Sequence, residues 1–218
     1  MRPLTDVSPK PLLEVRGKPL MQWPLEALAR GGFSEVVVNT AWLGEQIPAR
    51  FGSRHGASTL SYSHEGRDFG AALETAGGIV RALPLLGELF WVVAGDVFAP
   101  EFDFAQAAVD RFVESGRLAH LWLVPNPPHN PRGDFGIDAG GLALSEAPVK
   151  NTFSTIALYR AEFFARHADI PAGNPGGVKA PLAPMLRMAM KNGQVSAELY
   201  AGPWTDVGTP QRLAQLNQ

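Results

Sequence analysis

The stretch FWVVAGD, residues 90–96, has the pattern of a buried strand that ends in a carboxylate. An apolar run extends from Phe90 to Ala94 and is followed by Gly95 and Asp96. Short continuous apolar runs are typical of strands that helices cover on both faces of a sheet. Open α/β sheets bind their ligands beyond the carboxyl ends of the strands, so Asp96 stands where such a fold places its chemistry.

Similar runs recur along the chain, with helical patterns between them. We expect further strands at 35–39 and 120–124, and helices at 18–30, 43–51, 74–85 and 104–114. In the first of these helices Met21, Leu25 and Leu28 share one face. Pro19 suits its first turn, and Pro24 is expected to kink it. Strands that alternate with amphipathic helices predict βαβ units and a largely parallel sheet.

Beyond residue 125 the pattern changes. NPPHNPRGDFG, residues 126–136, is dense in Pro, Gly and Asn and predicts a loop. We expect strands at 135–145 and 152–159, and a helix at 180–191 with an apolar face. We interpret this part as an elaboration of the α/β core, so that residues 1–218 form a single domain without an appended repeat domain.

Composition excludes several classes of protein. The chain has 218 residues, is 45% apolar, and carries 19 Lys and Arg against 21 Asp and Glu. This charge balance makes nucleic acid an unexpected partner, and the chain has neither an apolar run long enough to span a membrane nor a signal-peptide pattern. We therefore expect a cytoplasmic protein with no membrane partner. Zero cysteines exclude disulfides, thiolate catalysis and Cys-ligated zinc.

The usual motifs of other enzyme classes are missing. The sequence contains no GxSxG, HExxH, GxxxxGK[ST] or GxGxxG pattern, which removes local support for hydrolase, zinc protease, P-loop and dinucleotide-binding functions. The five histidines, at positions 55, 64, 120, 129 and 167, show no metal-ligand spacing. We interpret them as surface or structural residues.

Two carboxylates follow strand-like segments and could share a metal ion. Asp96 ends the buried run, and Asp206 lies in PWTDVGTP before an expected N-cap and N1 pair, Thr209 and Pro210. Mg²⁺ typically takes one or two carboxylates together with substrate phosphates. The alternative for each is an ordinary turn aspartate, and only the fold could bring together residues so far apart in the sequence.

Two further segments are candidates for binding anions or a base. Lys10 lies in SPKPL, a proline-stiffened loop, although a single lysine is most often simply solvated. LETAGGI, residues 73–79, has a glycine pair that can bring backbone N–H groups close to a ligand. Its alternative is a tight turn that opens the following helix.

Taken in order, these motifs resemble those of the sugar-1-phosphate nucleotidyltransferases. The shared motifs are MRPLT, SPKPLLEV, AWLGEQI, LETAGGI, the GD after an apolar strand, RGDFG, TFS and WTDVGT, and they extend over essentially all 218 residues. Within that family the sequence is most similar to the bacterial N-acetylmuramate 1-phosphate uridylyltransferases of cell-wall recycling. The resemblance implies a Rossmann-like, GT-A-like α/β/α fold of three layers around a mostly parallel sheet.

The resemblance also implies a reaction and its residues. A sugar 1-phosphate, expected to be N-acetylmuramate 1-phosphate, attacks the α-phosphorus of a nucleoside triphosphate, expected to be UTP, and gives a UDP-sugar and pyrophosphate. Asp96 and Asp206 are expected to hold Mg²⁺, while Lys10 offsets charge on the phosphates. The expected nucleotide-binding residues, which border the base, are Glu74, Ala76 and Gly77. The expected residues of the sugar-phosphate pocket are Asp134, Thr152, Ser154 and Lys179.

In the family pattern a first strand, a Gly-rich loop and an arginine precede the methionine of RMRPLT, whereas this sequence begins at Met1. Without the strand, two apolar neighbours are expected to expose their edges. Without the loop and the arginine, the triphosphate loses N–H donors and a positive charge. We therefore expect the domain to be N-terminally incomplete, either because the start was placed too late or because this is a shortened, inactive relative.

Two alternatives to the uridylyltransferase remain open. A mannose-1-phosphate guanylyltransferase or a glucose-1-phosphate thymidylyltransferase shares RPLT, PKPL and GD. A protein that binds a nucleotide sugar without catalysis would explain the missing loop and arginine. The two metal-type carboxylates, Asp96 and Asp206, count against a mere binding protein.

Overall fold

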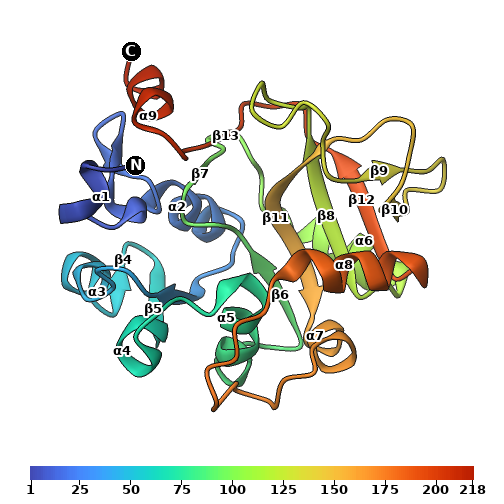
Figure 1. The fold of residues 1–218 in the computed structure, drawn as a ribbon, viewed down its shortest axis with the longest axis horizontal. Coiled ribbons are helices and arrows are strands. Elements are labelled where there is room, and N and C mark those ends of the chain that lie inside the picture. Colours follow the sequence, from blue (N-terminus) through green and yellow to red (C-terminus); the bar gives the residue numbers. More distant parts are fainter. The chain divides into compact units, whose positions relative to one another are not determined.

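The computed structural model describes residues 1–218, whose contacts group into two compact units. Unit 1 comprises residues 1–73, 94–106 and 202–218, and unit 2 comprises residues 74–93 and 107–201. The chain therefore passes between the units several times, as the colours of Figure 1 show. Whether the whole chain acts as the single domain expected from its sequence stays a prediction. None of its helices has the length and apolar character needed to cross a bilayer.

Unit 2 is built on a four-stranded sheet in the order β12-β8-β11-β6. Its strands are β6 (Leu89–Val92), β8 (Ala119–Val124), β11 (Thr152–Arg160) and β12 (Val195–Leu199). β12 is parallel to β8, and β11 is antiparallel to both β8 and β6. The sheet is thus mixed: β6, β8 and β12 point the same way, as βαβ units predict, and β11 alone runs against them.

Helices cover both faces of this sheet, so unit 2 has three layers. Side chains such as Leu121 and Leu123 of β8 are fully buried under α5 (Glu74–Ala82), α7 (Ala161–His167) and α8 (Leu182–Lys191), and α8 crosses the sheet in Figure 1. On the other face lies α6 (Gln106–Ser115), whose Phe112 ring packs 5.5 Å from the Arg160 guanidinium of β11. An α/β protein with helices on both faces of a sheet is therefore confirmed for this unit.

The strand expected at 135–145 is instead a hairpin of β9 (Gly136–Ile137) and β10 (Ala143–Leu144). Asp138 explains the turn, because its Oδ1 accepts the N–H groups of Gly140 and Leu142, each at 2.8 Å. The sequence DAGG, an aspartate with two glycines close behind it, favours such a turn over a continuous strand. The remaining element of unit 2 is the short 3₁₀ helix η2 (Leu83–Leu85), which follows α5.

A three-stranded sheet in the order β3-β5-β4 forms one half of unit 1. Its strands are β3 (Glu35–Thr40), β4 (Arg54–His55) and β5 (Ser58–His64), and its helices are α2 (Gln22–Arg30), α3 (Gln46–Phe51) and α4 (Glu65–Phe69). Leu25 of α2, Phe51 of α3 and Leu60 of β5 belong to the core beside this sheet. The predicted helices at 18–30 and 43–51 therefore exist, but each begins later than expected.

Pro24 lies in the first turn of α2, where proline disturbs a helix less than the expectation of a kink assumes. The helix begins at Gln22, so Pro24 is its third residue, and backbone N–H groups in the first turn have no intrahelical acceptor to lose. Lys18 and Pro19 belong to a short strand rather than to the helix. The apolar stripe of Met21, Leu25 and Leu28 is buried as predicted.

The other half of unit 1 joins the start and the end of the chain to its middle. Its elements are α1 (Leu4–Val7), the 3₁₀ helix η1 (Lys10–Leu12), β1 (Glu14–Val15), β2 (Lys18–Pro19), β7 (Val97–Phe98), β13 (Thr205–Asp206) and α9 (Pro210–Leu216). β1 pairs with β2, and β7 pairs with β13, both antiparallel. Their core is a buried cluster formed by Val15, Leu20, Phe98 and Val207.

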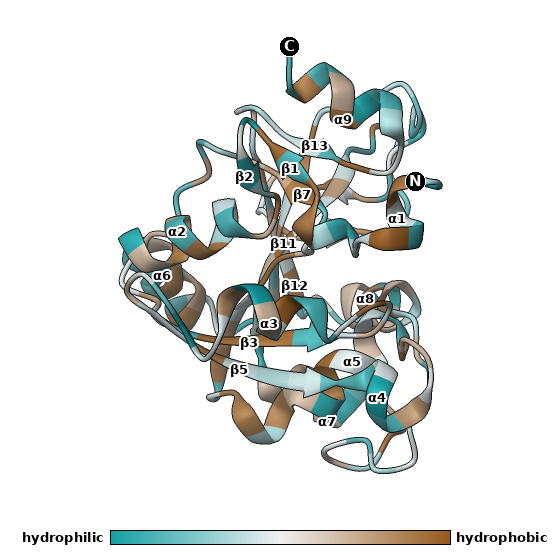
Figure 2. Cartoon of the chain, turned by 90° about the vertical axis from the view of Figure 1, so that its left-hand side faces the viewer, coloured by the Kyte–Doolittle hydropathy of each residue, from teal (hydrophilic) through white to brown (hydrophobic).

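Each of the two larger sheets ends in an apolar edge strand. β3 pairs with β5 alone, and β6 pairs with β11 alone. Val36, Val37 and Val38 make β3 apolar along its middle, as the brown of Figure 2 shows, and all three are only partly buried. Unpaired apolar edges attract further strands. Whether these two strands are the neighbours of an absent first strand stays a prediction.

Tyr159 of β11 offers a test of the packing in unit 2. Its side chain is fully buried among aromatic residues and its hydroxyl has no hydrogen-bond partner, and burial raises the pKa of that phenol far above its ordinary value. We predict that Tyr159→Phe raises the free energy of unfolding by about 1 kcal/mol, because it removes a buried unsatisfied group. Urea denaturation of the chain measures this change.

Tyr62→Phe is the matched control, because the Tyr62 hydroxyl donates to the carbonyl of Gly52. Loss of that hydrogen bond is expected to lower the free energy of unfolding by about 1 kcal/mol. If both variants were destabilised equally, the Tyr159 hydroxyl would have to possess a partner.

A polar cluster beneath α6 predicts a loss of stability in acid. The nearby His120, whose Nε2 lies 3.6 Å from Oε2 of Glu198, lowers the pKa of that carboxyl below 4.5, and Trp122 Nε1 donates to the same carboxylate at 2.6 Å. A lowered pKa stabilises the folded state above pH 4.5, and this contribution is lost as the pH falls through the folded-state value. We predict that Glu198→Gln flattens the acid side of the stability profile, measured by urea denaturation between neutral and acid pH. An unchanged acid slope would contradict this assignment.

Candidate active site

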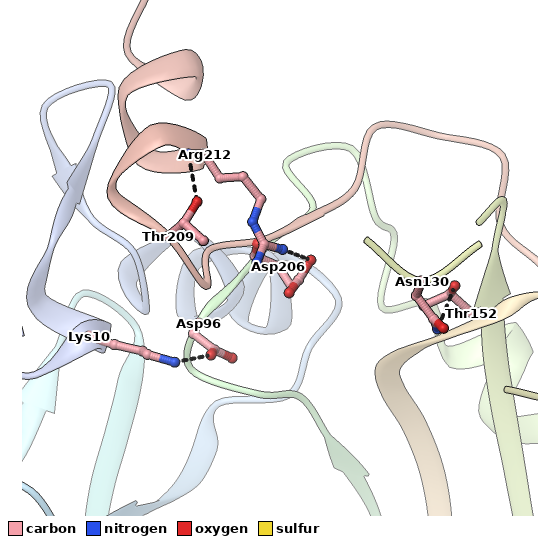
Figure 3. A network of polar contacts seen from close by, with 7 residues as sticks. All are labelled: Lys10, Asp96, Asn130, Thr152, Asp206, Thr209 and Arg212. Atoms are coloured by element: carbon pink, nitrogen blue, oxygen red, sulfur yellow. Dashed lines mark hydrogen bonds and ion pairs between the residues drawn. The ribbon is translucent and has the colours of Figure 1, made fainter. Parts of the chain in front are cut away.

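The pairing of β7 with β13 brings the two predicted carboxylates together in unit 1. Asp206 is paired with Val97, the residue after Asp96, and the N–H of Val207 donates to the carbonyl of Asp96 at 2.8 Å. Residues 110 positions apart thereby become neighbours, with Asp206 in β13 and Asp96 in the turn just before β7, as the metal hypothesis requires. Figure 3 shows both side chains at this point of the fold.

Lys10 reaches the same place from the proline-rich loop. Its Nζ lies 3.2 Å from Oδ2 of Asp96, and both side chains remain partly exposed. Gly95 makes room for the loop, since a Cβ at that position would lie 3.1 Å from Cγ of Pro11. The glycine before Asp96 thus allows the close approach that puts Lys10 beside the carboxylate.

Arg212 is a member of the site that the sequence analysis does not single out. Its Nη1 donates to Oδ1 of Asp206 at 2.6 Å and to the carbonyl of Asp206 at 2.9 Å. Thr209 caps α9 as predicted, because its hydroxyl oxygen accepts the N–H of Arg212 at 3.2 Å, and Pro210 occupies the first helical position. The sequence feature that could have indicated Arg212 is its position six residues after Asp206, in the first turn of the expected helix.

A cavity of about 430 Å³ opens in unit 1 next to Lys10. Its lining residues are Arg2, Thr5, Pro9, Lys10, Pro11, Asn39, Ala41, Trp42 and Ile47. Trp42 is exposed, and its Nε1 donates to the carbonyl of Thr5 at 2.7 Å, which fixes the ring at the cavity wall. The volume falls within the range of small-molecule sites.

Asp134 and Thr152 also come together, in unit 2, through two asparagines. Oδ2 of Asp134 accepts the N–H of Phe153 at 2.8 Å and a hydrogen bond from Asn130 at 3.2 Å. The Thr152 hydroxyl donates to Asn126 at 2.9 Å and accepts from Asn130 at 3.1 Å, a contact drawn in Figure 3. This network fixes the loop at 126–134 to the start of β11.

Ser154 lies in an irregular part of β11, where the pairing register shifts between Phe153 and Ala157. Its side chain is fully buried, and its hydroxyl donates to the carbonyl of Trp122 at 2.6 Å while accepting the N–H of Ile156. The neighbouring Thr155 has a left-handed φ of 64°, which is strained for a β-branched residue. The hydroxyl of Ser154 therefore supports the backbone of the bulge rather than lining a surface.

The residues predicted to border the base lie next to the segment that carries Lys179. The N–H groups of Ala76 and Gly77 both donate to the carbonyl of Ala180, at 3.0 and 3.2 Å, which places the exposed Lys179 beside the start of α5. These two N–H groups are therefore already engaged within the protein and do not point to a ligand. Glu74, exposed and with a left-handed φ of 59°, keeps a side chain that faces solvent.

The carboxylates of Asp96 and Asp206 fit a Mg²⁺ site in which the substrate supplies the remaining oxygen ligands. The chain contains no cluster of three or more His, Asp or Glu side chains that could enclose a metal ion. Mg²⁺ is usually held by one or two carboxylates and by substrate phosphates, which is the number of carboxylates that β7 and β13 bring together. Asp96 and Asp206 are the residues that would hold it.

Comparison with known proteins identifies the family of the chain. The model of the nucleotidyl transferase family matches residues 1–218. An N-acetylmuramate α-1-phosphate uridylyltransferase from Neisseria meningitidis is 46% identical over 99% of this chain and 90% of its own length. A second protein of that name, from Caulobacter vibrioides, is 29% identical over 97% of this chain and 88% of its own length.

Among solved structures, a Bacillus anthracis protein assigned as a glucose-1-phosphate thymidylyltransferase has the same fold. It aligns with a TM-score of 0.80 at 18% identity, over 100% of this chain and 88% of the other. At that identity the likeness concerns the fold alone.

The network around Asp134 generates a test of whether that residue is structural. We predict that Asp134→Ala lowers the free energy of unfolding by about 1–3 kcal/mol, because the N–H of Phe153 loses its acceptor. Asp169→Ala, at an exposed position of the same unit, is the control and should leave stability unchanged. Urea denaturation compares the two, and equal stability of both variants would mean that the network adds nothing to folding.

Proposed function

Because the chain belongs to the nucleotidyl transferase family, an enzyme family that acts on sugar 1-phosphates, we propose that it transfers a uridylyl group from UTP to N-acetylmuramate 1-phosphate. The observation that carries the choice of substrates is the 46% identity, over nearly the whole chain, to a relative of that activity. N-acetylmuramate is a cell-wall sugar, so the proposal includes a role in the recycling of such sugars.

The proposed reaction is a single in-line displacement. A phosphate oxygen of the sugar 1-phosphate forms a bond to the α-phosphorus of UTP, while the bond from that phosphorus to the β-phosphate oxygen breaks. Pyrophosphate leaves with the electron pair, and UDP-N-acetylmuramate is the other product. Such transfers ask a protein mainly for positioning of the reactants and for compensation of negative charge.

Unit 1 supplies the proposed charge compensation. The ion pair of Lys10 with Asp96 is partly exposed, and such pairs contribute at most about 1 kcal/mol. The ammonium group can therefore exchange its carboxylate partner for phosphate oxygens when a nucleotide enters the neighbouring cavity. We place the polyphosphate there because Lys10 and Arg2 both line that cavity.

The proposed metal ion is Mg²⁺, held by Asp96 and Asp206. When bound, it supplies positive charge to the phosphate oxygens of the nucleotide. The protein's own contribution is to hold one carboxylate in β13 and the other in the turn just before β7, with Lys10, which lines the cavity, 3.2 Å from Asp96.

The proposed roles in unit 2 are less uniform. Asp134 and Thr152 form hydrogen bonds to Asn130 and Asn126 of the loop at 126–134. Their proposed role is therefore to hold this loop in the conformation in which it contacts the sugar. Lys179 and Glu74 are both exposed, and we assign them the proposed contacts with the sugar phosphate and with the base, respectively. Ala76, Gly77 and Ser154 would act through the backbone that they shape.

The proposal is tested by pyrophosphate release from UTP and N-acetylmuramate 1-phosphate in the presence of Mg²⁺. We predict that Asp96→Asn and Asp206→Asn each lower kcat/KM by about 100-fold or more relative to the unsubstituted protein, the scale of losing one preorganised electrostatic contact. Asp103→Asn, an exposed aspartate of the same unit, is the control and should retain the rate.

Other outcomes of the same assay would contradict the proposal in different ways. Faster turnover with GTP or dTTP, or with mannose or glucose 1-phosphate, would replace the substrates and keep the chemistry. UTP binding without turnover by the folded chain, measured by equilibrium dialysis, would identify a nucleotide-binding protein.

A further inference from the structure

We propose that Arg212 is a positioning residue that holds the carboxylate of Asp206 in the orientation needed for metal binding. This inference rests on the proposed function, and it adds to the site a residue whose part is to orient a metal ligand. Every group involved belongs to unit 1, and the contacts are those drawn in Figure 3.

The guanidinium of Arg212 binds Asp206 at two points. Nη1 lies 2.6 Å from Oδ1 of the carboxylate and 2.9 Å from the backbone carbonyl of the same residue. One donor group thus ties the end of the Asp206 side chain to its own backbone, which restricts rotation of the carboxylate. Both side chains are partly buried, at 21% and 32% exposure, so water competes for these contacts less than it would at a fully exposed pair.

Two neighbouring residues allow Arg212 to reach Asp206. A Cβ at Gly208 would lie 2.5 Å from Nη2 of Arg212, so the guanidinium occupies space that only glycine leaves open. Thr209 starts α9 by accepting the N–H of Arg212, which fixes where the helix begins and hence where this side chain emerges. The segment DVGTPQR, residues 206–212, therefore contains every residue needed for the contact between Arg212 and Asp206.

The arginine is locally unfavourable where it stands. Arg212 is the third residue of α9, a position at which Glu or Gln would complete a capping box with Thr209. A cation there also opposes the helix dipole, whose N-terminal end is positive. Residues that break a local rule are expected at functional sites, and the gain that offsets this one is the contact with Asp206.

A group that hydrogen-bonds to a metal ligand and orients it raises the affinity of the site for the metal. Groups that orient a ligand typically change metal affinity by about 10- to 100-fold when they are removed. Arginine suits the task better than lysine, because its planar group donates several hydrogen bonds in fixed directions. The Lys10–Asp96 pair uses a single flexible ammonium, so the two carboxylates are held with different stiffness.

The experiment measures binding of Mn²⁺ to the full chain saturated with UTP, by the decrease in the electron paramagnetic resonance signal of free Mn²⁺. We predict that Arg212→Gln weakens Mn²⁺ binding by about 10- to 100-fold and that Arg212→Lys restores only part of the loss. In an Asp206→Asn background, Arg212→Gln should have no further effect, because the ligand that it positions is already lost.

The matched control is Arg166→Gln, which removes an arginine paired with Glu162 on the surface of unit 2 and should leave Mn²⁺ binding unchanged. Gly208→Ala is a second variant, which displaces the guanidinium while keeping its charge and should weaken Mn²⁺ binding even if Arg212→Gln does not fold. Thermal unfolding of each variant separates a loss of metal affinity from a loss of stability.

Unchanged Mn²⁺ affinity in folded Arg212→Gln and Gly208→Ala would overturn the inference and leave Arg212 a structural residue of α9. An undiminished effect of Arg212→Gln in the Asp206→Asn background would also overturn it. Absence of Mn²⁺ binding by the wild-type chain with UTP would refute both this inference and the proposed metal. Wild-type turnover with Mn²⁺ affinity unchanged in the variants would refute the inference alone.

Discussion

The two-residue pairing of β7 with β13 is the constraint on which the candidate site depends. It sets Asp206 opposite Val97 and joins Val207 to the carbonyl of Asp96, so that two distant segments present their carboxylates at one place. A ladder this short cannot be stable by its own hydrogen bonds, since isolated strand pairs are marginal in water. Its support is the buried cluster beneath it, formed by Val15, Leu20, Phe98 and Val207.

The charges around this ladder are arranged as two unlike pairs. Asp96 faces Lys10, whose flexible stem and partial exposure allow it to change partners. Asp206 faces Arg212, which is anchored by the start of α9 and by contacts to the backbone of Asp206. In the proposed reaction the first pair would open toward the phosphates, whereas the second would stay closed and keep its carboxylate in place.

The sequence predicts the members of the site better than their partners. Asp96, Asp206 and Lys10 follow from short motifs, because a carboxylate after an apolar strand and a lysine between prolines have local signatures. The use of the Ala76 and Gly77 N–H groups by Ala180 depends on a contact between distant segments, so no local pattern reveals it. The sequence pattern does not predict β5, because STLSYSH is largely polar. It does not predict β12 either, because VSAEL is short and its partner β8 is distant in the sequence. The sequence does not indicate Arg212, because helix-capping preferences, which predict Thr209 as the N-cap, favour Glu or Gln at the position of Arg212.

The central claim is that Asp96 and Asp206 form one metal site with a bound nucleotide, and its most direct test is the anomalous diffraction of Mn²⁺ in crystals of the chain grown with UTP. The account predicts a single strong anomalous peak in contact with both carboxylates and with phosphate oxygens of the nucleotide. A peak that touches neither carboxylate, or ordered nucleotide without any peak at the ladder, would contradict it.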